Sequence, residues 1–272
     1  MVKVRKKIPS PTRRLLSGSD IEEKSISETT LSRSDVYLGV VCPMANEGDD
    51  AVKFCRAVLQ ECQGFRSVTF FAVFDKVTHD RSLELMRGLE RSEPRLRVVW
   101  APENRCVVDA YLRGYNDALS AGCNWILEID AGFSHQPCDI PQFFAAMETG
   151  LDCVFGSRFL QEGGFEKSSL KRRFVSWGGT ALANLLLGTR QTDMTSGFEM
   201  FSSETLRMVI AHGIQSRAHF FQTEIKTYCR NLKFVEVPIT YRAASPRLGS
   251  SSLKEAFRQL RRLTQLRLKG EL

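Results

Sequence analysis

The 272 residues of this chain lack most of the features that would assign a function at once. No apolar stretch approaches the roughly 18 residues of a transmembrane helix, and no apolar run follows the basic start of the chain, as one would in a secretory signal. The eight cysteines never form C-x-x-C, which disfavours a zinc ribbon or thioredoxin-type site and predicts reduced core residues in a cytosolic protein. The glycine-rich motifs of dinucleotide-binding domains and P-loop ATPases are also missing.

Positive charge is spread unevenly along the chain. There are 38 Lys and Arg residues against 31 Asp and Glu residues, a formal charge of +7. Residues 1–35 carry +3 and residues 242–272 carry +6, which leaves −2 for the middle of the chain. A basic body would favour nucleic-acid binding, and this chain does not have one. Basic ends favour contact with an anionic membrane surface, and solvated tails are the other interpretation.

Strand and helix patterns alternate five times in the first half of the chain. This alternation predicts an α/β fold, with a mostly parallel sheet flanked by helices. The predicted strands are residues 36–42, 68–74, 98–100, 125–129 and 153–155, and the predicted helices are 49–62, 82–89, 107–121 and 141–147. The second half predicts helices at 172–187, 220–232 and 253–268, and a strand at 234–240 broken by Pro238. We expect a disordered basic tail (1–33), one domain (34–245) and a basic amphipathic helix (246–272).

Polar residues follow several of the predicted strands. In parallel sheets the ligand binds beyond the carboxyl ends of the strands, so these residues are candidate site residues. Acidic side chains suit a base N–H, a ribose hydroxyl or a metal that bridges to phosphate. Taken singly, Asp75 could be a turn former and Asp130 a helix N-cap. The residues are Pro43, Asn46 and Glu47 after the first strand, Asp75 after the second, Asp130 to His135 after the fourth, and Arg158 after the fifth.

Nine short motifs extend this pattern along most of the chain. They are Pro43-Met-Ala-Asn46-Glu47, Asp75 with Thr78 and Asp80, Ala110-Tyr-Leu-Arg-Gly114, Asp130-Ala-Gly-Phe-Ser-His-Gln-Pro137, Gly156-Ser-Arg158, Lys171-Arg172-Arg-Phe-Val-Ser176, Asp193-Met-Thr-Ser-Gly-Phe198, Phe221-Gln-Thr-Glu224 and Glu236-Val-Pro-Ile239. In this order they resemble the family-2 glycosyltransferases of GT-A fold, in particular dolichyl-phosphate mannose synthases and related polyprenyl-phosphate glycosyltransferases. The likeness runs from about Val36 to Leu263.

The resemblance implies an inverting hexosyltransferase. It would move a sugar from a nucleotide-diphosphate donor, GDP-mannose or a UDP-sugar, to a polyprenyl or dolichyl phosphate. The implied nucleotide-sugar-binding residues are Pro43, Asn46, Glu47, Asp75, Asp130, Ala131, Gly132 and Arg247. The implied catalytic residues are Asp130, Arg158, Arg172 and Asp193, and Mg²⁺ or Mn²⁺ would be held by Asp130 and Ser134. Arg158 and Arg172 would contact phosphate, because a guanidinium binds oxyanions bidentately, although Arg172 in its basic run also fits a solvated surface.

Two alternatives for the acidic and histidine residues stay open. Asp193 and Glu224 would either orient arginines or bind sugar hydroxyls, since a phosphate acceptor is already ionised and needs no strong general base. His135 before Pro137 fits a hydrogen-bonded structural histidine better than a catalytic one. The remaining histidines have no spacing typical of a metal site.

The chain departs from the family pattern at three places. Gly132 stands where the family has the second Asp of D-x-D, so metal dependence is weakened or lost, or only binding remains. Val107-Val-Asp109 replaces a glycine-rich segment, and Arg247-Leu-Gly-Ser-Ser251 differs in spacing from the family's R-x-x-G-x-S-K. These departures indicate a divergent branch. Alternatives are a soluble glycan, small-molecule or protein acceptor, or a catalytically silent sugar-nucleotide-binding protein.

The last predicted helix bears on how such an enzyme would reach a lipid. Apolar residues repeat there at helical spacing, with basic residues over much of the remaining surface. Such a helix either lies on anionic lipid or packs on the domain. We expect a cytoplasmic, peripheral membrane protein, docked directly or through a separate membrane subunit. The apolar residues are Leu253, Ala256, Phe257, Leu260 and Leu263.

Overall fold

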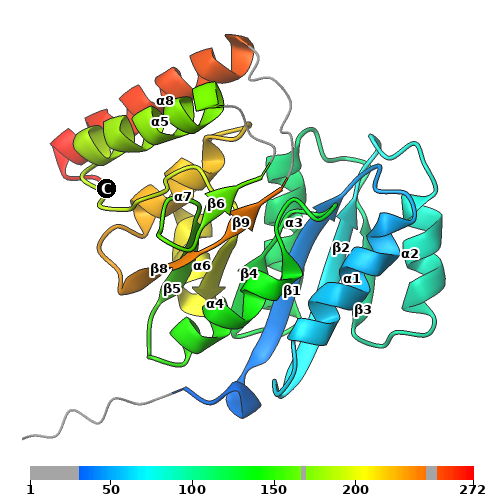
Figure 1. Cartoon of the computed structure of the whole chain (residues 1–272). Helices are drawn as coiled ribbons and strands as arrows, with labels where there is room; N and C mark the ends of the chain where they lie inside the picture. Colours follow the sequence, from blue (N-terminus) through cyan, green and yellow to red (C-terminus); the bar gives the residue numbers. More distant parts are fainter. Residues whose placement is uncertain (1–30, 167–169, 243–249) are drawn as a thin grey trace, which may run out of the picture.

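The computed structural model describes residues 31–166, 170–242 and 250–272. Its centre is a seven-stranded sheet in the order β3-β2-β1-β4-β7-β5-β8 (Figure 1). All neighbouring pairs are parallel except those of β7, which runs antiparallel to both β4 and β5. The strands are β1 (Tyr37–Met44), β2 (Ser67–Phe74), β3 (Leu96–Trp100), β4 (Trp125–Glu128), β5 (Cys153–Ser157), β7 (Glu199–Ser202) and β8 (Phe234–Pro238).

Helices cover both faces of this sheet, and each face has its own buried cluster. The first cluster is packed by α1 (Asp50–Glu61), α2 (Ser82–Glu90) and α4 (Ile140–Met147). The second is packed by α3 (Val107–Ser120), α6 (Ser203–His212) and α7 (Phe221–Tyr228). Strands buried on both faces read as continuous apolar runs, which is why they could be recognised in the sequence. At Gly114 in α3, a Cβ would overlap the side chain of Val41, so this glycine lets α3 lie close to the sheet.

Two further helices also contribute to the second cluster, through Ala183 and Leu187 of one and Leu260 and Leu263 of the other. α5 (Leu170–Leu187) and α8 (Ser250–Lys269) lie side by side, close to the C-terminus (Figure 1). Arg267 of α8 donates hydrogen bonds to the carbonyls of Leu185 and Leu186 at the end of α5. A small parallel sheet of β6 (Gly164–Phe165) and β9 (Thr240–Tyr241) lies near the loop after β4, because His135 bridges to Tyr241.

The structure agrees with the predicted alternation and adds elements that were not predicted. The α/β architecture with a mostly parallel sheet is confirmed. The antiparallel strand β7 and the helix α6 were missed, and the segment expected as one strand at 234–240 is divided at Pro238 into β8 and β9. Short 3-10 helices at Arg33–Asp35 and Pro137–Asp139 were missed too.

The ends of the predicted domain fall partly outside the described residues. Most of the predicted tail, residues 1–30, lies outside them, whereas Arg33 pairs with Glu148 of the domain at 2.9 Å. The predicted C-terminal helix is described from Ser250 onward. Six of the eight cysteines are buried, and all eight are free, whereas Cys138 is exposed.

Candidate active site

Asp130 lies just beyond β4, at the edge where β1, β2 and β4 end together. Its carboxylate accepts a hydrogen bond from the hydroxyl of Tyr111 in α3. Its backbone N–H donates to Nδ1 of His135 at 3.1 Å, while Nε2 of the same ring lies 3.8 Å from the Asp130 carboxylate. Burial lowers the pKa of His135 to about 4, so the ring is neutral and its proton is on Nε2. Two neutral side chains therefore hold Asp130 in place.

The turn that follows Asp130 brings Gly132 against Glu47. Gly132 and Phe133 both have positive φ, 67° and 55°. The phenyl ring of Phe133 packs edge-on against Phe54 with the ring centroids 5.2 Å apart, which anchors the turn in the core. A Cβ built on Gly132 would overlap Oε2 of Glu47. The carboxylate of Glu47 thus occupies the space into which a side chain at position 132 would project.

The loop after β1 is tied to the loop after β2. Asn46 Oδ1 accepts from the backbone N–H of His79 at 2.7 Å, and its amide donates to the carbonyl of Val77 at 3.0 Å. Asp75 follows β2 directly and accepts from the N–H of Val77 at 2.9 Å. Asn46 is therefore committed to holding the two loops together, and Pro43, Glu47 and Asp75 are gathered at the same edge of the sheet.

Arg158 and Asp193 form a buried bidentate ion pair. The guanidinium donates to both carboxylate oxygens of Asp193 at 2.7 Å. It also donates to the hydroxyl of Thr195 at 2.6 Å and to that of Ser176 at 3.3 Å. Burial opposes ionisation of Asp193, but the charge and hydrogen bonds of Arg158 outweigh it and hold the pKa of this carboxyl well below its usual range. Asp193 is therefore an arginine-orienting carboxylate and a very weak base.

A second buried ion pair supports the turn that carries Asp193. Lys226 of α7 has no exposed surface, and its ammonium donates to the carbonyls of Asp193 and Ser196 at 2.7 and 2.9 Å. The same ammonium lies 3.2 Å from the carboxylate of Glu199 in β7. These contacts hold the 193–196 turn in place. Because Asp193 binds Arg158, they also help to position the guanidinium.

A further buried polar group, Glu128, lies in β4 two residues before Asp130. Glu128 in β4 is fully buried and accepts hydrogen bonds from the hydroxyl of Tyr115 and the amide of Gln222. Burial raises the pKa of Glu128 well above its usual value, and the nearby charge of Glu199 adds to the shift. Sequence reasoning missed Tyr111, Tyr115, Glu128, Glu199, Gln222 and Lys226. Tyr111 and Gln222 stood inside recognised motifs, which was the available signal, whereas Lys226 and Glu199 gave none.

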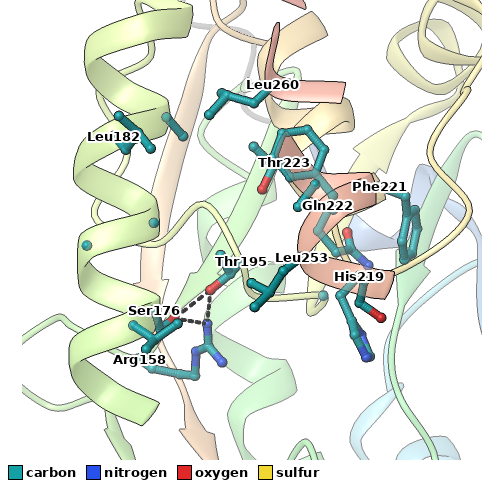
Figure 2. Close-up of a pocket in the computed structure, with 18 of the residues that line it drawn as sticks. Arg158, Ser176, Leu182, Thr195, His219, Phe221, Gln222, Thr223, Leu253 and Leu260 are labelled. Atoms are coloured by element: carbon teal, nitrogen blue, oxygen red, sulfur yellow. Dashed lines mark hydrogen bonds between the residues drawn. The ribbon is translucent and has the colours of Figure 1, made fainter. Parts of the chain in front are cut away.

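A cavity of about 440 Å³ opens beside these residues. At one end lie Asp130, His135 and Arg158, and its walls come from α5, α7 and α8. Figure 2 shows Arg158, Ser176 and Thr195 pointing toward one another at the polar end. It also shows Leu182 on one wall helix and Leu253 and Leu260 on the other. The cavity therefore joins an apolar channel to a polar, charged end.

Several of the predicted site residues lie together. Glu47, Asp130 and Gly132 meet at the edge of the sheet, and Asp130, Arg158 and Asp193 surround the polar end of the cavity or support it. Ala131 and Ser134 lie in the turn after Asp130, where the carbonyl of Ser134 accepts from the N–H of Arg242 at 2.9 Å. Arg172 belongs to α5, but its side chain lies outside the described residues, as does the whole of Arg247.

The acidic residues at this edge of the sheet could hold a divalent cation only with further oxygen donors from a bound phosphate or from water. In the described part of the chain, no three His, Cys, Asp or Glu side chains are grouped closely enough to hold a metal by themselves. Carboxylate and hydroxyl oxygens from Asp130, Ser134 and neighbouring Glu47 are nevertheless the donors that Mg²⁺ and Mn²⁺ prefer, and Mg²⁺ is commonly completed by phosphate oxygens and waters. The residues therefore fit a cation that arrives with a nucleoside diphosphate.

Solved structures define the class to which this architecture belongs. The chain is similar to glucosyl-3-phosphoglycerate synthase from Mycobacterium tuberculosis, crystallised with Mn²⁺, UDP and glucosyl-3-phosphoglycerate. The TM-score is 0.60, with 15% identity, over 92% of this chain and 85% of that one. Another structure of that synthase, with Mn²⁺, UDP and phosphoglyceric acid, gives a TM-score of 0.59 at 17% identity over 85% and 78%. At these identities the likeness concerns the fold, which is that of the GT-A glycosyltransferases.

Sequence comparison then gives the family. The profile of glycosyl transferase family 2 matches residues 40–209, and the chain belongs to this family. The undecaprenyl-phosphate mannosyltransferase of Micrococcus luteus is 31% identical over 163 residues, which are 59% of this chain and 66% of that protein. The polyprenol monophosphomannose synthase of Mycolicibacterium smegmatis is 26% identical over 224 residues, 80% of this chain and 83% of that protein. The predicted family and the predicted class of enzyme, a glycosyltransferase, are confirmed.

Proposed function

We propose that this protein transfers a hexose from a nucleotide-diphosphate sugar, GDP-mannose or a UDP-sugar, to a polyprenyl phosphate with inversion at the anomeric carbon. The two curated relatives are named for such acceptors. The observation that carries the proposal is the cavity, whose apolar walls suit a prenyl chain and whose charged end suits its phosphate. Arg158 lies at that end, and a guanidinium recognises phosphate oxygens well.

The residues divide the work by position. Pro43, Glu47 and Asp75 at the sheet edge would hold the base and ribose. Asp130, oriented by Tyr111 and His135, would face the diphosphate. A divalent cation held there with Ser134 would neutralise charge on the departing nucleoside diphosphate. The Mycobacterium tuberculosis synthase, which has a similar fold, was crystallised with Mn²⁺ and UDP, and this supports a divalent cation in the proposal.

The acceptor phosphate needs orientation more than deprotonation. It is ionised near neutral pH, so its oxygen attacks the anomeric carbon without a strong general base. Asp193 is accordingly assigned to hold Arg158, which in turn positions the phosphate, and Arg172 of α5 is proposed as a second phosphate contact. The alternative role of Asp193, binding sugar hydroxyls, is disfavoured because both of its oxygens are engaged by Arg158.

The outer helices are proposed to bring the protein to the cytosolic surface of a membrane. Among the described helices, none combines the length and hydropathy that crossing a membrane requires. Large apolar side chains are nevertheless exposed on α5 and α8, the two helices that contribute walls of the cavity. The clearest are Phe174, Trp177 and Leu185 of α5 and Phe257 and Leu268 of α8. Peripheral docking, alone or with a membrane subunit, would place the cavity against the lipid that supplies the acceptor.

The test is transfer by the full-length chain, measured with radiolabelled GDP- and UDP-sugars, polyprenyl phosphate and Mn²⁺ or Mg²⁺. The expected product extracts into organic solvent. Gly179→Phe, on the α5 wall, should raise the KM for polyprenyl phosphate by about tenfold or more, since a Cβ there meets no atom within 4 Å and the ring would enter the channel. Gly88→Phe in α2, a helix glycine with equally open surroundings, is the matched control.

Two outcomes would contradict the proposal. Absence of a product with every donor would favour a silent sugar-nucleotide-binding protein, for which Gly132 is the motivating feature. A product that stays in water with a soluble glycan, small molecule or protein would favour a soluble acceptor. If Gly179→Phe left the KM for polyprenyl phosphate unchanged, the channel would not be the acceptor site.

A further inference from the structure

An aspartate at position 132, where the family pattern places one, would meet the carboxylate of Glu47. The backbone of Gly132 has φ of 67°, a left-handed conformation that glycine adopts more readily than other residues. A Cβ on this residue would also overlap Oε2 of Glu47. The turn has been built around a carboxylate that comes from another loop.

Hydrogen bonds hold the backbone of the loop that carries Glu47. Its backbone N–H and that of Gly48 both donate to the hydroxyl of Ser82 at 2.8 Å. The N–H of Gly48 also donates to the carboxylate of Asp80 at 2.7 Å. With Asn46 bonded to the same 77–80 segment, the loop that carries Glu47 is fixed at three successive residues. The backbone at Glu47 is therefore fixed beside the turn that carries Gly132.

Glu47 lies against the turn that follows Asp130. Among the described residues, neither Glu47 nor Asp130 has a Lys or Arg within ion-pair distance, and the side-chain neighbours of Asp130 are Tyr111 and His135. Two carboxylates that face the same space repel one another, and a divalent cation between them would remove that repulsion.

We propose that Glu47 supplies the second carboxylate of the metal site, in place of the missing aspartate at position 132. Glu47 and Asp130 then bind the cation that accompanies the nucleoside diphosphate, and Gly132 is the residue that makes room for this exchange. The inference rests on the proposed nucleotide-sugar donor. It reassigns Glu47 from a contact with ribose to a contact with metal.

The experiment measures metal binding directly and uses no acceptor. The full-length protein is titrated with Mn²⁺ in the presence of GDP or UDP, and free Mn²⁺ is followed by its electron paramagnetic resonance signal. Glu47→Gln should weaken Mn²⁺ binding by about tenfold or more, because it keeps the shape of the side chain and removes its charge. Asp50→Asn is the matched control, because it removes a neighbouring exposed charge and should change the affinity by less than about twofold.

A double variant tests the exchange of positions. Gly132→Asp alone should not tighten Mn²⁺ binding, because the new side chain meets Glu47. Glu47→Ala combined with Gly132→Asp should bind Mn²⁺ more tightly than Glu47→Ala alone. If the double variant gained nothing over Glu47→Ala, the exchange of positions would be wrong. The Glu47→Gln measurement stands independently should the double variant fail to fold.

A metal-free measurement separates the two roles of Glu47. With EDTA present, binding of guanosine or uridine should be the same for the wild type and for Glu47→Gln. Equal losses with and without metal would assign Glu47 to the ribose and overturn the inference. Unchanged Mn²⁺ affinity in Glu47→Gln would overturn it as well. Because none of these titrations contains polyprenyl phosphate, their outcome is distinct from success or failure of the proposed transfer reaction.

Discussion

At the scale of single residues, Lys226 is the charged side chain most dependent on its partners. It is fully buried, and its ammonium is bound by two backbone carbonyls and by Glu199. Lys226→Met leaves Glu199 buried without its cationic partner and the two carbonyls without their donor. We expect the free energy of unfolding to fall by about 3–5 kcal/mol in urea denaturation.

The double replacement provides the control. Lys226→Met combined with Glu199→Leu removes both charges, and a buried ion pair exchanged for apolar residues often costs little stability. We expect the double variant to recover most of the loss, yet to stay impaired in transfer because the turn that holds Asp193 has lost its donor. A single variant that unfolds like the wild type would show that the pair contributes nothing to stability.

Glu199 gives this network a pH dependence of definite sign. Burial raises its pKa from 4.5 to about 7, and the charge of Lys226 opposes that shift. Between these values the folded protein binds more protons than the unfolded chain. The stabilisation from Glu199 is therefore complete at low pH and is lost as the pH rises toward 7.

The comparison of wild type with Glu199→Gln isolates this contribution. From about pH 5 to about pH 7.5, the wild-type advantage in unfolding free energy should fall by on the order of 1–3 kcal/mol. Urea denaturation at the two pH values measures it. An advantage that grows with pH would reverse the assigned direction of the pKa shift.

The same residues show how far the sequence could lead toward the site. Asp130 and Arg158 were predicted because polar residues after parallel strands share one edge of a sheet. The contact of Lys226 with Asp193 joins residues 33 positions apart and depends on how α7 packs under the turn. A lysine in a polar helix reads as solvated, so its burial could not be predicted. The contact between Glu47 and Gly132 could not be predicted either, because it depends on β1 and β4 being neighbours in the sheet.

At the scale of helices and strands, the elements with a clear hydrophobic pattern were the ones that could be predicted from the sequence. β1 and β2 are eight residues each, apolar and buried on both faces, and their positions were predicted closely. β7 has four residues, one of them the buried Glu199, and α6 follows it without a turn. A charged residue inside a strand of this length obscures the apolar run by which strands are recognised. The antiparallel insertion in the middle of the sheet was missed for that reason.

The apolar residues of the amphipathic helix α8 are not all in the same environment: some are buried and others are exposed. Leu260 and Leu263 are buried against the domain, so this part of the predicted stripe packs on the protein. Phe257, one turn before Leu260, is 62% exposed. The packing interpretation therefore applies to one part of the helix, and the membrane proposal rests on the other part.

Matched substitutions on α8 test this division. Phe257→Ser should weaken binding to lipid vesicles by about tenfold or more, since an inserted Phe contributes roughly 1.5–3 kcal/mol, with the melting temperature unchanged. Leu260→Ser should instead lower stability by about 2–5 kcal/mol. Vesicle sedimentation and thermal denaturation read the two effects separately. If Phe257→Ser bound vesicles like the wild type, its exposed face would not be the docking surface.

At the scale of the whole molecule, charge and apolar surface coincide. The C-terminal 31 residues carry +6, whereas residues 36–241 carry −2. Lys254, Arg258, Arg261 and Lys269 are exposed on α8, while Arg262 and Arg267 are bound to Glu224 and to the end of α5. The exposed set therefore lies on the helix that also presents Phe257. An acidic body with one basic, apolar face is oriented by an anionic surface before any lipid is recognised.

The orienting effect predicts a salt dependence that belongs to α8 alone. Arg258→Gln with Arg261→Gln removes two charges worth about 1 kcal/mol each near anionic lipid, so binding should weaken roughly thirtyfold. The effect should vanish on neutral phosphatidylcholine vesicles. It should also vanish at about 1 M salt, where the Debye length is about 3 Å. Lys53→Gln with Lys76→Gln removes two exposed charges from the body and should have little effect, which is the control. Equal losses in both pairs would mean that net charge, and not the face formed by α8, governs attachment.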